Sequence, residues 1–357
     1  MGDSSLQLPE SIPSTFIRGG TSKGIFIKED NLPSDRKIWS AIFTKIMGSP
    51  DPHLRQLNGM GGGISSLSKI CIIRGSSDEN TVEFTFCQVG IENEICDFNG
   101  TCGNLMAAVA PFAYEEDVVK PIIESQQATV IIKDLNTDKY VRVSFPLKQD
   151  NKVDWNGQHE ISGVSGTGPR ITCEYLNVGG SKTGKLYPTG NKMDLLQIGT
   201  DTIEATLIDG PNPTIFVAAE QFQTSPHQTL NEKTLLLLEK IRVAGAVKMG
   251  LSNSIEEAER IQAIPKISLI SKHPGGIRAL TLSMKVVHKA IPITASLCLA
   301  ICMASEGTLP HRIKDGDRIY HPTGYIDVKA NLDQGSNGVT ASIVTTAKKL
   351  MKGFVFL

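Results

Sequence analysis

The sequence predicts an α+β protein made of two similar units. Most of its 357 residues read as short strands separated by turn residues, but two segments, 105–110 and 293–304, are apolar on every side. A helix without a polar stripe has no face for water and must be buried. Each segment follows a β-rich block, so we expect a duplicated α+β unit with one hydrophobic helix in each copy.

The length allows two domains of ordinary size. Residues 157–190 are dense in Gly, Ser, Thr and Pro, which is typical of a junction or a long crossing loop. We therefore expect an N-terminal α+β domain over 1–185 and a C-terminal α+β domain over 186–357, with the last strand as a candidate to return to the first domain.

Composition excludes several classes of function. Lys and Arg number 36 against 37 Asp and Glu, so no global charge draws the chain to nucleic acid or to a membrane. No apolar run approaches the roughly 18 residues of a spanning helix, and the N-terminus lacks a signal-peptide pattern. Seven cysteines without a Cys-x-x-Cys pair favour reduced thiols in the cytoplasm over disulfides or a zinc site.

The first half contains a hairpin, a helix and a glycine-rich loop. Strands 14–18 and 25–27 flank a Gly/Ser/Thr turn at 19–24, which offers backbone donors. Residues 38–47 have a helical pattern that stops at Gly48-Ser49-Pro50. The glycines of 59–63 let a backbone approach a ligand closely. Further β-rich runs are 67–73, 82–89, 129–133 and 140–145.

The second half repeats this plan. Strands are predicted at 203–208 and 214–219, joined by the turn Asp209-Gly210-Pro211-Asn212-Pro213. An amphipathic helix is predicted over 235–249, and strands over 267–270 and 280–287. The apolar segment 293–304 then provides the second buried helix.

Cys102 stands where the first apolar segment begins, within Asn99-Gly100-Thr101-Cys102-Gly103-Asn104. The first turn of a helix points unpaired N–H groups and a positive dipole end outward, which stabilises a thiolate and attracts an anion. A buried structural cysteine is the commoner fate of a free thiol and remains the alternative here.

Lys69 is the second candidate for chemistry. Strand alternation puts Leu67, Lys69 and Cys71 on one face, so a lysine stands among apolar neighbours. A desolvated lysine can act as a base, and the adjoining loop with Ser65 and Ser66 supports that role. Most lysines lie at the surface, which is the alternative.

Other motifs are set aside or left open. Gly179 to Lys185 has P-loop spacing, but Leu186 replaces the hydroxyl residue that holds Mg²⁺. The Ser-x-x-Lys match at Ser66 opens a β-branched run, whereas the serine β-lactamases need a helix there. His288 and His321 could each bond a carboxylate or serve as structural groups.

Together these pieces resemble the PrpF family, which includes 2-methylaconitate isomerase, aconitate Δ-isomerase, methylitaconate isomerase and 4-oxalomesaconate tautomerase. The resemblance covers nearly the whole chain. It rests on segments at 18–24, 47–51, 59–63 with 68–69, 101–104, 184–190, 212–213, 249–251, 265–266, 283–284, 321–324 and 347–353.

The resemblance implies a diaminopimelate-epimerase-like fold of two similar α+β domains, each with a β barrel-like sheet wrapped around a central hydrophobic helix. It places the active site between them and implies no cofactor and no metal. Related racemases have a second cysteine where this chain has Ile293-Thr294-Ala295-Ser296, so a two-thiol mechanism is not expected. The family pair of lysine and cysteine maps onto Lys69 and Cys102 as catalytic residues.

The resemblance implies an isomerase that takes a small di- or tricarboxylate. The implied activity is a cofactor-independent 1,3-proton shift, by double-bond migration or cis/trans isomerisation, in an unsaturated tricarboxylate, with aconitate (cis to trans) or 2-methylaconitate as the favoured substrate. Methylitaconate and 4-oxalomesaconate are alternative substrates, and a non-catalytic carboxylate-binding protein is the alternative of another class. A homodimer is a candidate assembly. The expected substrate-binding residues are Arg18, Thr21, Ser22, Lys23, Gly62, Ser65, Ser66, Gly103, Asn104, Ser283 and His321. Departures from the family pattern at 283–289 and at Tyr320 bear on which carboxylate is used.

Overall fold

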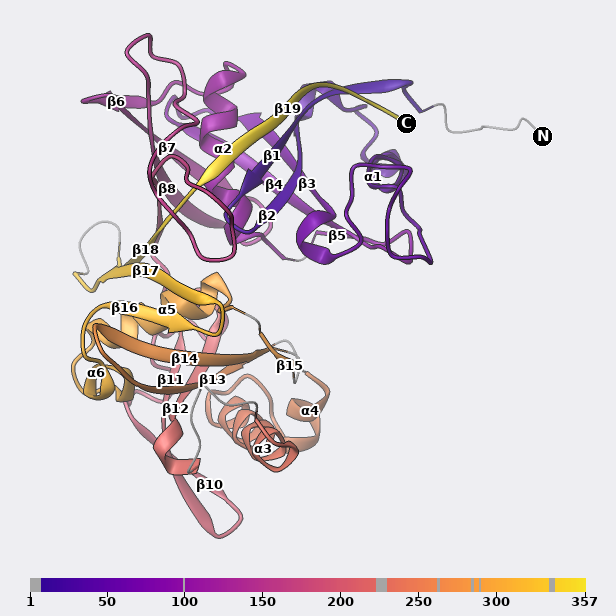
Figure 1. Cartoon of the computed structure of the whole chain (residues 1–357). Coiled ribbons are helices and arrows are strands. Elements are labelled where there is room, and N and C mark those ends of the chain that lie inside the picture. The colour runs from indigo at the N-terminus through magenta and orange to yellow at the C-terminus, as the bar shows by residue number, and fades with distance from the viewer. Residues whose placement is uncertain are drawn as a thin grey trace. The chain divides into compact units, whose positions relative to one another are not determined.

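The structure is a computed structural model that describes residues 8–98, 100–222, 230–261, 264–283, 286–288, 290–333 and 338–357, without the side chains of Ser283 and Val286. The chain divides into two compact units (Figure 1). Unit 1 comprises Met1–Cys173 and Thr345–Leu357, and unit 2 comprises Glu174–Val344. In the part of the chain that the structure describes, no helix is long and apolar enough to cross a membrane.

Unit 1 is a sheet with a helix on each face. Its elements are β1 (Ser11–Gly19), β2 (Ser22–Lys28), α1 (Trp39–Met47), β3 (Lys69–Gly75), β4 (Thr81–Val89), β5 (Cys96–Asp97), α2 (Gly103–Glu115), β6 (Ile122–Glu124), β7 (Gln127–Asp134), β8 (Lys139–Pro146) and β19 (Ala347–Phe356), with 3-10 turns at Glu29–Asn31, Arg36–Ile38 and Ser65–Leu67. The strand β9 (Ile171–Leu176) crosses the division between the units.

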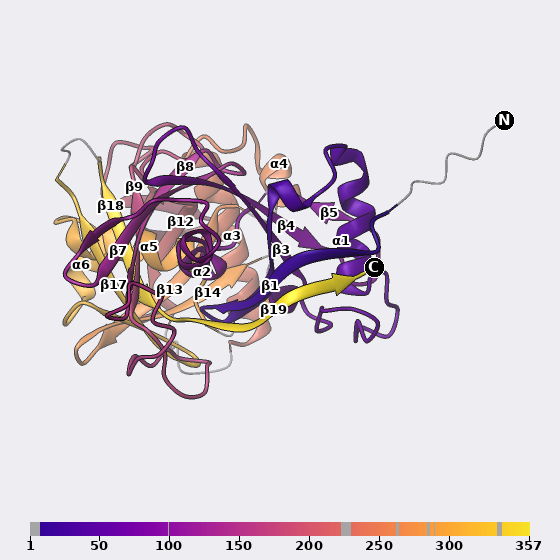
Figure 2. The ribbon, with the colours of Figure 1, turned by 90° about the horizontal axis from the view of Figure 1, so that it is seen from above.

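Strand pairing sets which side chains face which helix. The hairpin β1–β2 is antiparallel and joins β3 in parallel, β3 pairs antiparallel with β4, and β4 joins β7 in parallel. The last strand, β19, pairs with β1 (Figure 1). Figure 2 views α2 nearly along its axis, with β1, β3 and β4 between α2 and α1. Side chains therefore alternate between an α1 face and an α2 face.

The helix α2 is the buried helix that the sequence predicts. Every residue from Leu105 to Ala113 is buried, and the ring of Phe112 packs 5.6 Å from that of Phe26. Each fully buried large apolar side chain adds about 1.5–3 kcal/mol over an exposed one. The helix ends at Glu115, where polar residues return.

Unit 2 follows a similar order of elements. They are β10 (Asp194–Ile198), β11 (Asp201–Asp209), β12 (Pro213–Ala218), α3 (Glu232–Lys248), α4 (Ile255–Arg260), β13 (Lys266–His273), β14 (Gly276–Ser283), β15 (Val286–Val287), α5 (Ile293–Ala304), α6 (Leu309–Ile313), β16 (Arg318–His321), β17 (Gly324–Asn331) and β18 (Thr340–Thr345), with a 3-10 turn at Ala219–Phe222. The elements β10, α4 and α6 are additions to the order of unit 1.

The pairings of unit 2 confirm the predicted duplication. The hairpin β11–β12 joins β13 in parallel, β13 pairs antiparallel with β14, and β14 joins β16 in parallel. These are the relations of β1–β2 to β3, of β3 to β4 and of β4 to β7 in unit 1. The helix α3 packs on one face with Leu207, Ile215 and Leu269, and α5 is the second buried helix.

Two predicted strands differ from the strands of the structure. The strand predicted from Leu67 begins at Lys69, because Ser65–Leu67 forms a 3-10 turn. The strand predicted over 280–287 is two antiparallel strands, β14 and β15, in which Leu282 pairs with Val287. Residues 280–287 contain no Gly, Pro, Asn or Asp that would signal such a reversal.

Candidate active site

Lys69 is the first residue of β3 and its side chain faces α2. It is only 8% exposed, and its Nζ donates to Oε1 of Gln88 on β4 over 2.6 Å. The ammonium also lies 4.9 Å from the centroid of the Phe86 ring. Pairing of Lys69 with Gln88 in the ladder holds both side chains on one face. The lysine is therefore buried with a neutral partner rather than a carboxylate.

Cys102 caps the start of α2 with an extended backbone and is 7% exposed. The thiol of Cys71, two residues after Lys69, lies near both candidates. Burial is the main cause that raises the pKa of Cys71; Cys102 raises it further and the charge of Lys69 lowers it. Cys71 therefore lies close to both Lys69 and Cys102 on the α2 face of the sheet.

The β1–β2 turn packs against the start of α2. The N–H of Thr21 donates to Oδ1 of Asn104 over 3.3 Å. A Cβ on Gly19 would stand 2.6 Å from the carbonyl oxygen of Asn104, so only glycine permits this approach. Ser22 is buried and shares the α2 face with Gly24, which lies against Leu105 and Lys69. The structure thus brings Thr21, Ser22 and Asn104 to the end of the sheet that carries Lys69.

Arg18 and Lys23 are directed elsewhere. They pair across the hairpin and lie on the α1 face, opposite Ser22. Nη1 of Arg18 donates to the carbonyls of Gly20 and Thr346 over 2.8 and 3.1 Å, and burial lowers its pKa. The ammonium of Lys23 lies 5.2 Å from the Phe16 ring centroid. Both cations therefore have structural contacts within unit 1.

The glycine-rich loop is fastened by a buried amide. Nε2 of Gln56 donates to Ser49 and Ser68 over 2.9 and 2.8 Å, and its Oε1 accepts from the N–H of Gly63. Gly62 lies against Leu67, where a Cβ would stand 2.6 Å from a methyl carbon. Ser65 is exposed and its carbonyl accepts from Gln88, while Ser66 is partly buried.

The remaining predicted site residues are Gly103 in unit 1 and His321 and Ser283 in unit 2. Gly103 is the first residue of α2 and follows Cys102 directly. In unit 2, His321 is 5% exposed, ends β16, and its Nδ1 lies 3.3 Å from the Thr323 hydroxyl. Burial is the main cause that lowers the pKa of His321, with further lowering by His288 and Arg278. The backbone of Ser283 ends β14, but its side chain lies outside the described residues.

Sequence reasoning missed the amides that hold the site. Gln88, Gln56 and Asn136 each bond two or more groups, and Asn136 ties the Phe98 carbonyl before Cys102 to the Phe86 backbone. No motif marks them. The one feature of the sequence that could have indicated Gln88 is its position at the end of a strand face that is otherwise apolar, across from Lys69.

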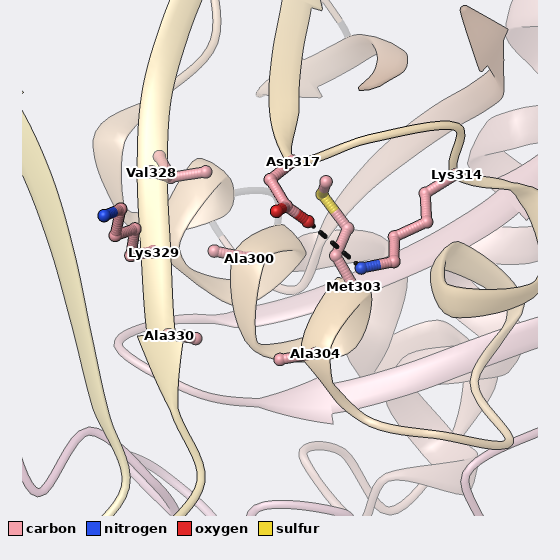
Figure 3. Close-up of a pocket in the computed structure, with 8 residues that line it drawn as sticks. All are labelled: Ala300, Met303, Ala304, Lys314, Asp317, Val328, Lys329 and Ala330. Atoms are coloured by element: carbon pink, nitrogen blue, oxygen red, sulfur yellow. Dashed lines mark hydrogen bonds and ion pairs between the residues drawn. The ribbon is translucent and has the colours of Figure 1, made fainter. Parts of the chain in front are cut away.

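A pocket of about 340 Å³ in unit 2 is lined by Ala300 and Met303 of α5, by β17, and by the Lys314–Asp317 ion pair at 3.1 Å (Figure 3). Within the described residues, no group of three His, Cys, Asp or Glu side chains is placed to hold a metal ion.

Known proteins resemble this chain along its whole length. The model of the PrpF protein family matches residues 10–357. A 2-methyl-aconitate isomerase of Shewanella oneidensis is 32% identical over 383 residues, covering 96% of each protein. A 4-oxalomesaconate tautomerase of Pseudomonas putida is 30% identical over 360 residues, covering 96% of this chain and 95% of that protein.

Solved structures agree. A methylitaconate-delta-isomerase superposes with a TM-score of 0.89 at 32% identity, covering 98% of this chain and 96% of that one. A hydroxyproline epimerase from Agrobacterium vitis has a TM-score of 0.53 at 11% identity, covering 99% and 94%; that likeness concerns the fold alone and confirms the predicted epimerase-like fold. The chain therefore belongs to the PrpF family and is an isomerase.

Proposed function

We propose that this isomerase moves a carbon–carbon double bond in an unsaturated tricarboxylate by a 1,3-proton shift, and that Lys69 and Cys102 transfer the proton. The observation that carries the proposal is the buried Lys69 ammonium, bonded at 2.6 Å to the neutral amide of Gln88 on the sheet face that meets the start of α2. The Gln88 amide holds the Lys69 side chain on this face without forming an ion pair with it.

The proton balance is simple. A base takes a proton from the allylic methylene, and the C–H electron pair becomes the new double bond. The π pair of the old double bond then accepts a proton at the far carbon, so the product is an isomer of the substrate. Lys69 and Cys102 act as this acid–base pair, and neither is assigned as the initial base.

The carbanionic intermediate needs stabilisation because allylic carbon acids are weak. Its charge spreads into an attached carboxylate, which preorganised donors stabilise as the charge forms. The N–H groups at the start of α2 and the loop at Ser65 and Ser66 supply donors of this kind. No step requires a cofactor, since both proton carriers are side chains.

Aconitate, converted from the cis to the trans form, and 2-methylaconitate are the substrates we favour. Relatives that cover nearly the whole chain are a 2-methyl-aconitate isomerase and a methylitaconate-delta-isomerase. Tautomerisation of 4-oxalomesaconate is the second candidate, since a tautomerase of that compound is 30% identical. In aconitate, 2-methylaconitate, methylitaconate and 4-oxalomesaconate alike, the acidic C–H is allylic and next to a carboxylate or ketone carbonyl.

Proton NMR in D₂O tests the proposal. The enzyme is incubated with cis-aconitate, 2-methylaconitate, methylitaconate and 4-oxalomesaconate in turn. We expect one of them to isomerise with deuterium entering at the carbon that gains hydrogen. If none of the four shows isomerisation or deuterium uptake while calorimetry still detects binding, the proton-shift proposal is wrong.

A further inference from the structure

Lys266 occupies in unit 2 the place that Lys69 occupies in unit 1. Each lysine begins a strand that pairs in parallel with the second strand of a hairpin, β13 with β12 and β3 with β2. The strand sequences match as well, Lys69-Ile-Cys-Ile-Ile against Lys266-Ile-Ser-Leu-Ile. The duplication therefore gives each unit one lysine at the same corner of its sheet.

The side chain of Lys266 faces α5. Its neighbour Ile267 belongs to the cluster beneath α3, so strand alternation turns Lys266 to the other face. Ser268 shares that face and bonds Thr281 over 2.7 Å. Burial lowers the pKa of Lys266, and the nearby thiol of Cys298 on α5 acts in the opposite sense. No described side chain forms a hydrogen bond or ion pair with the Lys266 ammonium.

Two histidines lie along the edge of β14 that is opposite β13. The N–H of His288 donates to the Thr281 carbonyl over 2.9 Å, and His321 ends β16, which runs along the same edge of β14. Burial is the main cause that lowers the pKa of His288, and Lys266 lowers it further. The histidines are therefore mostly neutral at pH 7, and each can donate one ring N–H.

The carboxylate of Asp209 already has hydrogen-bond partners. Asp209, which adjoins Cys298, accepts from the hydroxyls of Ser181 and Thr183 and from the backbone N–H groups of Lys182 and Thr183, over 2.6–2.8 Å. These four bonds occupy the carboxylate. A half-buried cation without a partner, beside neutral donors, needs an anion from outside the described chain.

We propose that Lys266 anchors a carboxylate-binding site in unit 2, completed by His288 and His321. The site takes one carboxylate of the polycarboxylate substrate, an inference that rests on the proposed function for the identity of the anion. One cation with two neutral donors suits a singly charged group with two oxygens. Lys266 is thus a substrate-binding residue in addition to those expected from the sequence.

Calorimetry with tricarballylate, a saturated tricarboxylate that cannot isomerise, tests the site in the full chain. We expect Lys266→Met to weaken binding about 10- to 100-fold, because a charge-assisted hydrogen bond is lost, and Lys266→Arg to retain most of it. The control is Lys272→Met, at the exposed far end of the same strand. Equal binding by Lys266→Met and wild type, or no binding by wild type, would overturn the proposal.

Footprinting of the wild type removes any doubt from variant folding. The native enzyme is acylated with a succinimidyl ester with and without tricarballylate, and each lysine is quantified by mass spectrometry. The ligand is expected to slow labelling of Lys266 and to leave Lys272 unchanged. Unaltered Lys266 labelling at saturating ligand overturns the site. Deuterium exchange reports separately on proton transfer, so either proposal can fail while the other stands.

Discussion

The Lys69 ammonium lies 2.6 Å from the amide oxygen of Gln88, and the amide nitrogen of Gln88 donates to the carbonyls of Ser65 and Ser68 over 3.1 and 2.9 Å. One side chain thus fixes the lysine and the serine loop together. Residues 65–68 and 88 are far apart in sequence, and only pairing of β3 with β4 joins them.

Replacing Lys69 by Met should abolish isomerisation while leaving the fold intact. Loss of a general acid–base group costs roughly 10²–10⁴ in rate, and Met preserves most of the buried volume. Turnover followed by NMR and folding followed by circular dichroism give the two readouts. Lys45→Met, at an exposed position of α1, is the control. Near-normal activity of Lys69→Met would remove Lys69 from the mechanism.

Replacing Cys102 by Ser tests the second proton carrier. A serine hydroxyl is far less acidic than a thiol, so we expect kcat to fall at least about 100-fold with little change in substrate KM. Cys96→Ser, on the neighbouring strand β5, is the matched control and should keep its activity. A full-rate Cys102→Ser enzyme would show that the thiol carries no proton.

Replacing Gln88 by Leu tests whether this amide positions Lys69 without itself transferring a proton. The substitution leaves the buried Lys69 ammonium without its acceptor and frees the carbonyls of Ser65 and Ser68. We expect a fall in kcat of about 10- to 100-fold, since losing a bond to a charged group costs about 1.5–3 kcal/mol. Gln88→Glu, which places a carboxylate beside the Lys69 ammonium, should also lower kcat and should change the pH–rate profile. An unchanged pH–rate profile in both variants would contradict the positioning role.

Gly19→Ala should displace the β1–β2 turn from α2. The added Cβ would meet the Asn104 oxygen at 2.6 Å and the Leu105 Cα at 2.9 Å, both backbone atoms that cannot rotate away. We expect a loss of about 1–3 kcal/mol in the free energy of unfolding, measured by urea denaturation, together with reduced activity. Gly75→Ala, whose nearest contact would be 3.5 Å, is the control and should be nearly neutral.

Asp134 should make stability depend on pH. Burial raises the pKa of Asp134 above the ordinary 3.8. At a pH between the pKa of the unfolded chain and the higher pKa of the folded state, Asp134 is therefore protonated more often in the folded state. The stabilisation that Asp134 contributes is present below the pKa of the carboxyl in the unfolded chain. It is lost as the pH rises through the pKa of the carboxyl in the folded state. We expect the unfolding free energy of wild type, relative to Asp134→Asn, to fall as pH rises from about 4 to 7. The control is Asp138→Asn, at an exposed position nearby. If the difference in unfolding free energy between wild type and Asp134→Asn does not change with pH, the prediction is wrong.

Local patterns predicted much of this architecture. The two apolar segments identified α2 and α5, because an unpatterned apolar helix can only be buried. The turn at Gly19 and the glycines near Gly62 were recognisable because close backbone approach demands glycine. Lys69 was singled out by strand alternation, since a lysine between Leu67 and Cys71 breaks an apolar face.

The sequence by itself determined the duplicated α+β plan, the family and the choice of Lys69 and Cys102 as candidates. Only the tertiary structure decided which polar groups accompany them: Gln88 beside Lys69, and Arg18 and Lys23 on the face opposite Ser22. The physical reason is register. Shifting a strand by one residue reverses the face of every side chain, and pairing between distant strands, which no local pattern encodes, fixes that register.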